Sequence, residues 1–266
     1  MISQSLVNFR LKYPLKRLSI NQTKWEYLVL GNGRETVLFL HGMMGAYDVW
    51  WQQITALLDQ YKIISLTYPT VDTLEGLSQG ILAILQSEKV SRVKIVGTSM
   101  GGYLAQYLML KYPEIISCVV LGNTFPPNDL LRRKILILLK VLPFLPQSLI
   151  IKLLKRNIVK KIYPASQYCD VTLNYLLEFL LKRINKKQII SRVKVIMENF
   201  ELSDIKTLKI PIQIIESDND PLVEEILRER LKSIYSSAQI YTFSSAGHFP
   251  YINRAEHYTN LLKKFF

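Results

Sequence analysis

The amino-acid sequence predicts one α/β domain, in which a mostly parallel sheet is covered by helices on both faces and a helical unit is inserted late. The first observation is that short, continuously apolar runs alternate with segments of helical periodicity. The second is a gap of about 90 positions between two blocks of this pattern. The third is a serine–glycine motif at the point where an expected strand meets an expected helix.

The strands are expected where short apolar or β-branched runs are bounded by turn residues. Apolar residues recur at helical spacing between those runs. The expected strands span 17–20, 25–30, 36–40, 62–66, 93–96, 117–121, 211–215 and 239–243. The expected helices of the main block span 49–58, 74–85, 100–110, 222–231 and 257–265.

The gap from Leu121 to Pro211 is far longer than a crossover between parallel strands, which needs about a dozen residues. Its composition is helical, and we expect a helical cap over the carboxyl ends of the strands, where open α/β sheets bind ligands. The expected cap helices span 130–142, 148–161, 171–184 and 187–200. The expected division is a first core part at 1–125, a cap at 126–205 and a second core part at 206–266.

The charge is strongly basic and unevenly distributed. The formal net charge is +13, and residues 126–200 hold 15 Lys or Arg against 4 Asp or Glu. This basic cap has two interpretations: a peripheral contact with an anionic membrane surface, or a solvated basic face above an apolar pocket. Nucleic-acid binding is not expected, because no recognised binding motif accompanies the charge.

The location expected from the sequence is the cytoplasm. Residues 1–19 lack the basic and apolar segments of a signal peptide. The most apolar stretch, 135–145, is interrupted by Lys140 and Pro143 and is shorter than the roughly 20 residues of a membrane span. Cys118 and Cys169 are far apart and are expected to be reduced thiols.

The motif Gly97-Thr98-Ser99-Met100-Gly101-Gly102 follows the expected strand 93–96 and opens a helix. This is the context of a nucleophile elbow, in which a strained turn exposes the serine hydroxyl and flanking glycines allow strand and helix to approach closely. The helix N-terminus directs free N–H groups toward the reacting oxygen. Ser99 is therefore the candidate nucleophile.

A second loop, His41-Gly42-Met43-Met44-Gly45, follows the expected strand 36–40 and is the candidate source of an oxyanion donor. The expected donors are the backbone N–H groups of Met43 and Met100, with Met44 as the alternative to Met43. His41 is expected to brace the loop. The residues expected to line a substrate pocket are Gly42, Met44, Trp50, Tyr103 and Phe249.

The remaining members of a triad are expected in late loops. Asp218 and Asp220 both follow the expected strand 211–215, and we favour Asp220 because it directly precedes Pro-Leu-Val at the start of a helix. The end of strand 117–121 offers no carboxylate. His248 follows the strand 239–243, which gives the order Ser, Asp, His expected for such a sheet; His257 is expected at the surface.

These residues predict acyl-transfer chemistry. His248 would take the proton of Ser99 as it attacks a carbonyl, and Asp220 would hold the imidazole. Two backbone N–H groups would stabilise the oxyanion, and water would then hydrolyse the acyl-enzyme. The mechanism needs no cofactor, and the sequence has no metal-ligand spacing.

With these motifs placed, the chain resembles the α/β-hydrolase fold (AB hydrolase-1) family and, within it, the maspardin group. The stretches that carry the narrower resemblance are Phe9–Lys16, Thr23–Trp25, Gly45–Trp50, Leu66–Pro69, Gly101–Gln106, Gly122–Phe125 and Gly247–Tyr251. The resemblance covers most of the core, whereas the cap matches only loosely, and it implies two functional alternatives. Animal maspardins are viewed as binding or adaptor proteins with an incomplete triad, whereas this chain has His248 and Asp220 in place.

The favoured hypothesis is a carboxylesterase-like serine hydrolase acting on a small apolar acyl substrate. The alternative is a non-catalytic, maspardin-like binding protein that retains the fold. A dehalogenase is disfavoured because its nucleophile is a carboxylate where this chain has Ser99. Perhydrolase and carbon–carbon hydrolase chemistry share the triad and stay open, as does the oligomeric state.

Overall fold

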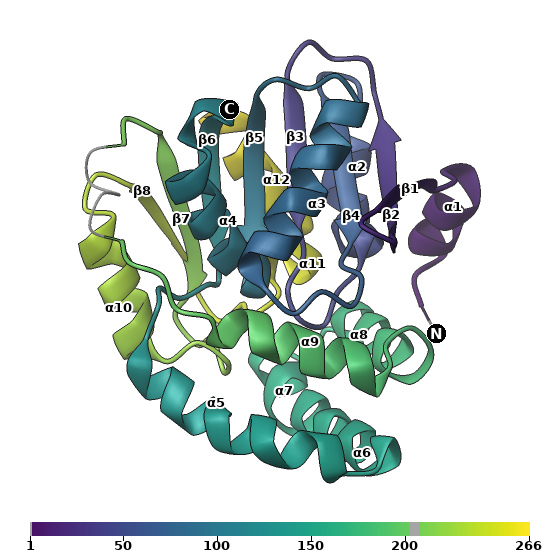
Figure 1. Ribbon diagram of the computed structural model, residues 1–266, viewed down its shortest axis with the longest axis vertical. Coiled ribbons are helices and arrows are strands. Elements are labelled where there is room, and N and C mark those ends of the chain that lie inside the picture. The colour runs from purple at the N-terminus through teal and green to yellow at the C-terminus, as the bar shows by residue number, and fades with distance from the viewer. Residues whose placement is uncertain (1, 203–207) are drawn as a thin grey trace.

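The computed structural model describes residues 2–202 and 208–266 and contains an eight-stranded, mostly parallel sheet between two layers of helices (Figure 1). The strand order is β1-β2-β4-β3-β5-β6-β7-β8. Antiparallel pairing joins β1 to β2 and β2 to β4, and every other neighbouring pair is parallel. The strands are β1 (Lys16–Ile20), β2 (Thr23–Leu30), β3 (Thr36–Leu40), β4 (Lys62–Thr67), β5 (Val93–Thr98), β6 (Ile116–Gly122), β7 (Ile212–Ser217) and β8 (Gln239–Phe243).

Helices cover both faces, as the uninterrupted apolar strands predict. Helices α3 and α4 lie on one face, and α2 and α12 lie on the other (Figure 1). In β3, Val37 and Phe39 pack into one core and Leu38 and Leu40 into the other. The helices outside the cap are α1 (Gln4–Lys12), α2 (Trp51–Leu57), α3 (Leu74–Ser87), α4 (Met100–Lys111), α10 (Glu225–Ile234), α11 (Pro250–Asn253) and α12 (Ala255–Phe265), with 3-10 turns η1 (Tyr47–Trp50) and η2 (Pro113–Ile115).

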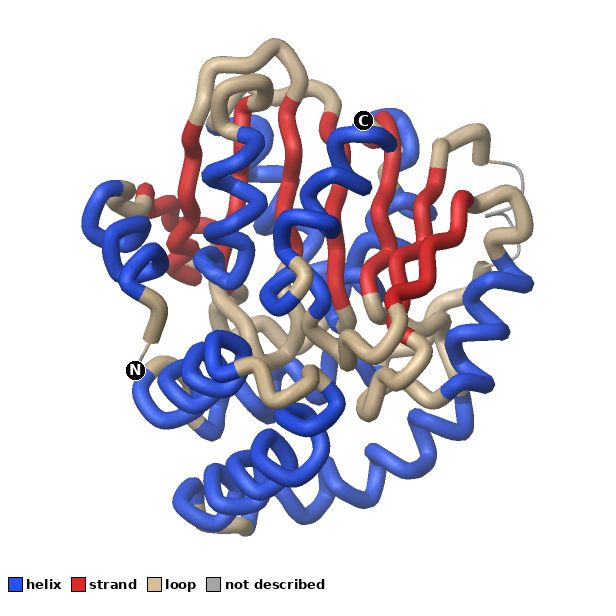
Figure 2. The backbone as a smooth tube through the Cα atoms, turned by 180° about the vertical axis from the view of Figure 1, so that it is seen from behind, coloured by secondary structure: helices blue, strands red, loops and turns tan. Residues whose placement is uncertain are grey.

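The chain between β6 and β7 forms a group of helices at the carboxyl ends of the parallel strands, and Figure 2 shows the same layer from behind. The proposed boundary at 205 lies outside the described residues, and the three-part division stays a prediction. None of the described helices is long and apolar enough to cross a membrane. The elements of this cap layer are α5 (Asp129–Val141), η3 (Leu142–Phe144), α6 (Gln147–Asn157), the π-helical η4 (Ile158–Ile162), α7 (Tyr163–Ala165), α8 (Asp170–Lys182) and α9 (Lys186–Met197).

Two local expectations differ from the structure. The helix expected at 222–231 begins at Glu225, because the Asp220 carboxylate accepts the N–H groups of Leu222 and Val223 and holds them in a turn. Helix α1 was not expected, and it buries Leu6 and Phe9.

Candidate active site

Ser99 lies in the sharp turn between β5 and α4. Its φ of 52° is in the left-handed region, where a residue with a side chain is strained. The end of β6 holds the turn: the Ser99 N–H donates to the Gly122 carbonyl at 2.9 Å, and Thr124 Oγ1 donates to the Ser99 carbonyl at 2.7 Å. These two hydrogen bonds therefore hold the strained conformation that exposes the hydroxyl.

The two glycines of the motif are required by close backbone approach. A Cβ on Gly97 would lie 2.4 Å from the Gly101 carbonyl oxygen, and one on Gly101 would lie 2.2 Å from that of Leu40. Both distances are far shorter than van der Waals contact, so a side chain at either position would force the strand and helix apart.

The structure brings His248 and Asp220 together in the loops after β8 and β7. His248 Nδ1 lies 2.8 Å and 3.0 Å from the two carboxylate oxygens of Asp220, and both side chains are almost completely buried. Gly247, with φ of 64°, donates its N–H to Asn219 Oδ1 at 2.8 Å. The Asn219 amide also donates to the Ala165 carbonyl at 2.9 Å, which links the histidine loop, the acid loop and the cap.

Asp220 is held as a carboxylate by a full set of donors. Asn123 Nδ2 donates to Oδ2 at 2.9 Å, and the N–H groups of Leu222 and Val223 donate to Oδ1 at 2.8 and 3.1 Å. Burial acts to raise the pKa of Asp220, but the charge of His248 and these hydrogen bonds outweigh it and lower the pKa below the ordinary value. The group therefore stays ionised at neutral pH.

Asp218, the alternative acid, does not contact His248 among the described residues. Its side chain is exposed, and Oδ1 accepts the Ser245 N–H at 2.8 Å. Among the described residues, the His248 ring contacts the carboxylate of Asp220 and not that of Asp218.

The loop from His41 to Gly45 lies directly against the nucleophile. A Cβ on Gly42 would be 3.1 Å from the Ser99 Cβ. The N–H groups of Met43, Met44 and Met100 have no hydrogen-bond acceptor within the part of the chain that the structure describes, which leaves them available to a substrate oxygen. The structure therefore does not separate Met43 from Met44 as the expected donor.

The fully buried Arg192 of α9 holds this loop from the cap side. Its guanidinium donates to the carbonyls of Met43 and Gly45 and lies 5.5 Å from the Phe179 ring centroid. Burial without a carboxylate from any described residue lowers the pKa of Arg192 to about 10. The cap thus contributes directly to the position of the candidate oxyanion loop.

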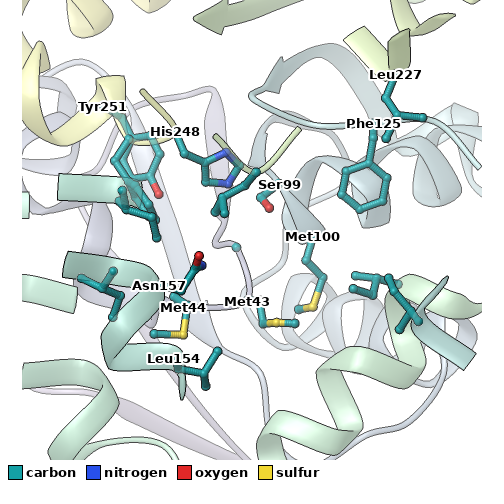
Figure 3. A pocket seen from close by; sticks show the side chains of 17 residues that line it. Met43, Met44, Ser99, Met100, Phe125, Leu154, Asn157, Leu227, His248 and Tyr251 are labelled. Atoms are coloured by element: carbon teal, nitrogen blue, oxygen red, sulfur yellow. The ribbon is translucent and has the colours of Figure 1, made fainter. Parts of the chain in front are cut away.

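A largely apolar cavity of about 250 Å³ lies between the core and the cap. The Ser99 hydroxyl points into it, with the His248 ring next to it, in the view of Figure 3. The core contributes Phe125 and Tyr251, and the cap contributes Leu154 and the amide of Asn157. The cavity is therefore a site for a mostly apolar ligand with its reactive group at Ser99.

The structure places three of the five expected pocket residues, Gly42, Met44 and Phe249, on this cavity. Trp50 and Tyr103 were expected there and do not line it. Trp50 is buried behind the site, 4.4 Å from the Tyr251 ring centroid. Tyr103 packs against Phe125 and Phe200 and donates its hydroxyl to the Glu198 carbonyl.

Within the described residues, no group of three or more His, Cys, Asp or Glu side chains is placed to hold a metal ion. Cys118 and Cys169 are free thiols outside the cavity lining. Among the described residues, the groups available for chemistry at the cavity therefore include the serine, the histidine, the Asn157 amide and backbone N–H groups.

Comparison with known proteins agrees with this geometry. A family profile described as alpha/beta hydrolase fold matches residues 35–255. The chain belongs to the alpha/beta-hydrolase family. It is 24% identical over 256 residues to maspardin from Danio rerio, an alignment covering 93% of this chain and 80% of that protein.

Solved alpha/beta hydrolases share the fold. The structure matches the enol-lactonase from Burkholderia xenovorans with a TM-score of 0.80 and 16% identity, over 94% of this chain and 99% of that one. A thermophilic esterase from Thermogutta terrifontis gives the same score and identity, over 94% and 97% of the two chains. At this identity the likeness shows the fold alone.

Sequence reasoning missed several residues of this alpha/beta-hydrolase site, among them Asn123, Asn157, Arg192 and Asn219. Asn123 stands at the end of β6, where only a carboxylate was sought, yet it binds the carboxylate supplied by β7. Arg192 lies three residues from each of the buried Ile189 and Val195, so a cation on an apolar helix face was the available signal. The amides of Asn157 and Asn219 carry no comparable signal.

His41 braces the hydrolase loop as expected. It is fully buried, Nδ1 donates to the Gly42 carbonyl, and Nε2 accepts the Tyr68 N–H at 3.2 Å. Burial and the Arg192 charge lower the pKa of His41 well below its ordinary value. The ring therefore stays neutral in the folded protein at a pH where it is protonated in the unfolded chain.

This difference predicts an acid-dependent loss of stability. Below the unfolded pKa of about 6.5, the unfolded chain binds a proton at His41 that the folded chain does not, so folding weakens as pH falls. Relative to His41→Gln, the wild type should lose about 1.4 kcal/mol more per pH unit between pH 6 and 5 in urea unfolding. His257→Gln, at an exposed histidine, is the control and should keep the wild-type slope; an unchanged slope in His41→Gln would contradict the assignment.

Proposed function

We propose that this protein is a serine hydrolase that cleaves a carboxylic ester or related acyl bond of a small, mostly apolar substrate. The observation that carries the proposal is the Asp220–His248 pair beside Ser99 at an apolar cavity. The family supports a hydrolase scaffold, and the cavity supports an apolar acyl group. The proposed esterase activity rests on Ser99, His248 and Asp220 of this chain, because the similarity to solved structures shows the fold alone.

The proposed mechanism uses the catalytic residues Ser99, His248 and Asp220. Ser99 Oγ attacks the carbonyl carbon while His248 Nε2 accepts its proton, and Asp220 stabilises the resulting imidazolium through Nδ1. The oxyanion is bound by the N–H groups of Met100 and of Met43 or Met44. His248 then protonates the leaving alcohol, which departs and leaves an acyl group on Ser99.

Water completes the cycle. His248 removes a proton from a water molecule as its oxygen attacks the acyl carbon. The second tetrahedral intermediate then collapses to release the acid, while His248 returns the proton to Ser99 Oγ and regenerates the serine. Because Asp220 is ionised at neutral pH, the imidazolium of each step has its counter-charge in place.

The test is covalent labelling with a small fluorophosphonate, which reacts with activated serines without requiring the natural substrate. We expect mass spectrometry of the intact wild type and its peptides to place one adduct on Ser99. Ser99→Ala should remain folded and unlabelled, and Ser217→Ala is the matched control, because Ser217 is a buried serine outside the cavity lining.

The similarity to maspardin leaves one competing function, a binding protein that retains the fold. A folded wild type that neither reacts with a fluorophosphonate small enough for the cavity nor hydrolyses acyl esters would favour that function. Labelling confined to Ser99, followed by turnover of short or medium acyl esters, would favour the hydrolase.

A further inference from the structure

The outward side of α5, η3 and α6 is unusually apolar for a solvent-exposed surface. Half of the large hydrophobic side chains that the described residues leave exposed fall between positions 136 and 159. The most exposed are Phe144 at 86% and Ile137 at 70%. Isolated exposed apolar residues are ordinary, but a concentration on one pair of helices marks an interaction surface.

Helix α5 has apolar residues on two opposite sides. Ile135 lines the cavity, whereas Ile137, Val141 and Phe144 recur at helical spacing on the exposed side. Lys140 lies among them and is also exposed. Contact with the cavity accounts for the inward side of the helix, whereas Ile137, Val141 and Phe144 on the outward side are exposed in the part of the chain that the structure describes.

Helix α6 repeats this arrangement. Leu154 faces the cavity, while Leu149 and Leu153 are exposed at a spacing of four residues. Lys152 and Arg156 lie on the same outward side, three residues after each leucine. Both helices therefore present alternating apolar and cationic side chains to solvent, and Figure 1 places both in the layer farthest from the sheet.

The charge on this surface has one sign. Residues 130–169 contain nine Lys or Arg and no Asp or Glu. No ion pair between described residues involves the exposed cations at 140, 152, 155, 156, 160 or 161. The complementary partner is therefore anionic as well as able to receive apolar side chains.

We propose that the outward face of α5, η3 and α6 docks onto the surface of an anionic lipid bilayer. Helices that lie in a membrane interface combine apolar residues, which enter the acyl boundary, with Lys and Arg, which bind anionic headgroups. A nucleic acid would use the cations and leave Phe144 and Ile137 exposed. The docked helices would lie along the bilayer, with the cavity on their opposite side.

The experiment is flotation of the purified full chain with vesicles. One set is pure phosphatidylcholine, and the other contains phosphatidylcholine and phosphatidylserine in a 7:3 ratio, as a probe composition with ample anionic lipid. We expect flotation with the anionic vesicles, at least tenfold weaker partitioning into the neutral ones, and weakening with added salt. The result does not depend on whether Ser99 is a nucleophile.

Two variants separate the apolar from the electrostatic contribution. The double variant Ile137→Ser/Phe144→Ser removes exposed apolar side chains, and the double variant Lys152→Gln/Arg156→Gln removes exposed charges. Each double variant should lower the partition coefficient about tenfold or more. Leu11→Ser is the matched control, because Leu11 is 80% exposed on α1, at the far side of the sheet from α5. Thermal unfolding of every variant verifies that it is folded.

Several outcomes would overturn the proposal. One is the absence of flotation with anionic vesicles, and another is equal flotation of the Ile137/Phe144 variant and the wild type, which would mean adsorption by net charge alone. A wild-type dimer in sedimentation velocity that becomes a monomer in that variant would assign the face to a second copy of the chain. Oligonucleotide binding that needs the cations but not the apolar residues would assign it to a nucleic acid.

Discussion

Asp220→Asn is expected to lower kcat for ester hydrolysis by about 10⁴-fold, the magnitude known for the same change in a serine protease triad. The asparagine preserves the shape of the side chain and can still accept the N–H groups of Leu222 and Val223. Its amide nitrogen can face Nδ1 of His248 only as a donor, which favours the wrong imidazole tautomer. The fold should survive while the general base is lost.

Asp218→Asn is the matched control for this measurement. Asp218 is one of the same pair of acids in the same loop, but it is exposed and accepts one backbone N–H from Ser245. Its variant should keep kcat within about twofold, because a surface substitution away from the site has little effect. The acid assignment would be wrong if Asp218→Asn lost activity and Asp220→Asn kept it.

Asp48→Asn is expected to lower the free energy of unfolding by about 3 kcal/mol, because it removes a fully buried carboxylate from two largely buried arginines, to which only Glu178 then remains as a counter-charge. The Asp48 side chain is 0% exposed and accepts Arg10 Nε and Arg183 Nη1, each at 2.6 Å. Tyr175 also donates to it at 3.0 Å. These partners come from α1 and from the cap, so the carboxylate joins three parts of the chain.

Urea unfolding followed by circular dichroism measures this loss, and Asp72→Asn is its control. Asp72 pairs with Lys194 at the surface, where both side chains are 47% exposed, and such pairs contribute about 0–1 kcal/mol. Equal losses in the two variants would mean that the buried network adds no more than a surface ion pair. The expected excess is at least about 2 kcal/mol.

The sheet and the three triad candidates were predictable because their signals are local. A strand such as β3 is buried on both faces and therefore reads as an unbroken apolar run. The turn at Ser99 is likewise recognisable from adjacent residues, because the backbone approaches so closely at Gly97 and Gly101 that only glycine fits there. Chain order then separated His248 from the other histidines.

The rest of the site depends on contacts between distant residues. Trp50 and Tyr103 lie beside the motifs in sequence, but packing against Tyr251 and Phe125 turns them away from the cavity. Helix α1 has little apolar periodicity, and its Arg10 is anchored through Asp48 and through Glu178 of the cap. No pattern of neighbouring residues in the sequence predicts contacts between residues that lie so far apart along the chain.

The hydrogen bonds from Arg192 to the Met43 and Gly45 carbonyls limit which cap helices of this protein can be replaced. The helices between β6 and β7 line part of the cavity and are therefore the obvious segment to exchange. Here the exchange of α9 would remove the guanidinium and leave two backbone carbonyls beside Ser99 without a donor. A graft that keeps α9 and replaces α5 and α6 alone would alter the pocket wall and the outer surface while retaining the support of the candidate oxyanion loop.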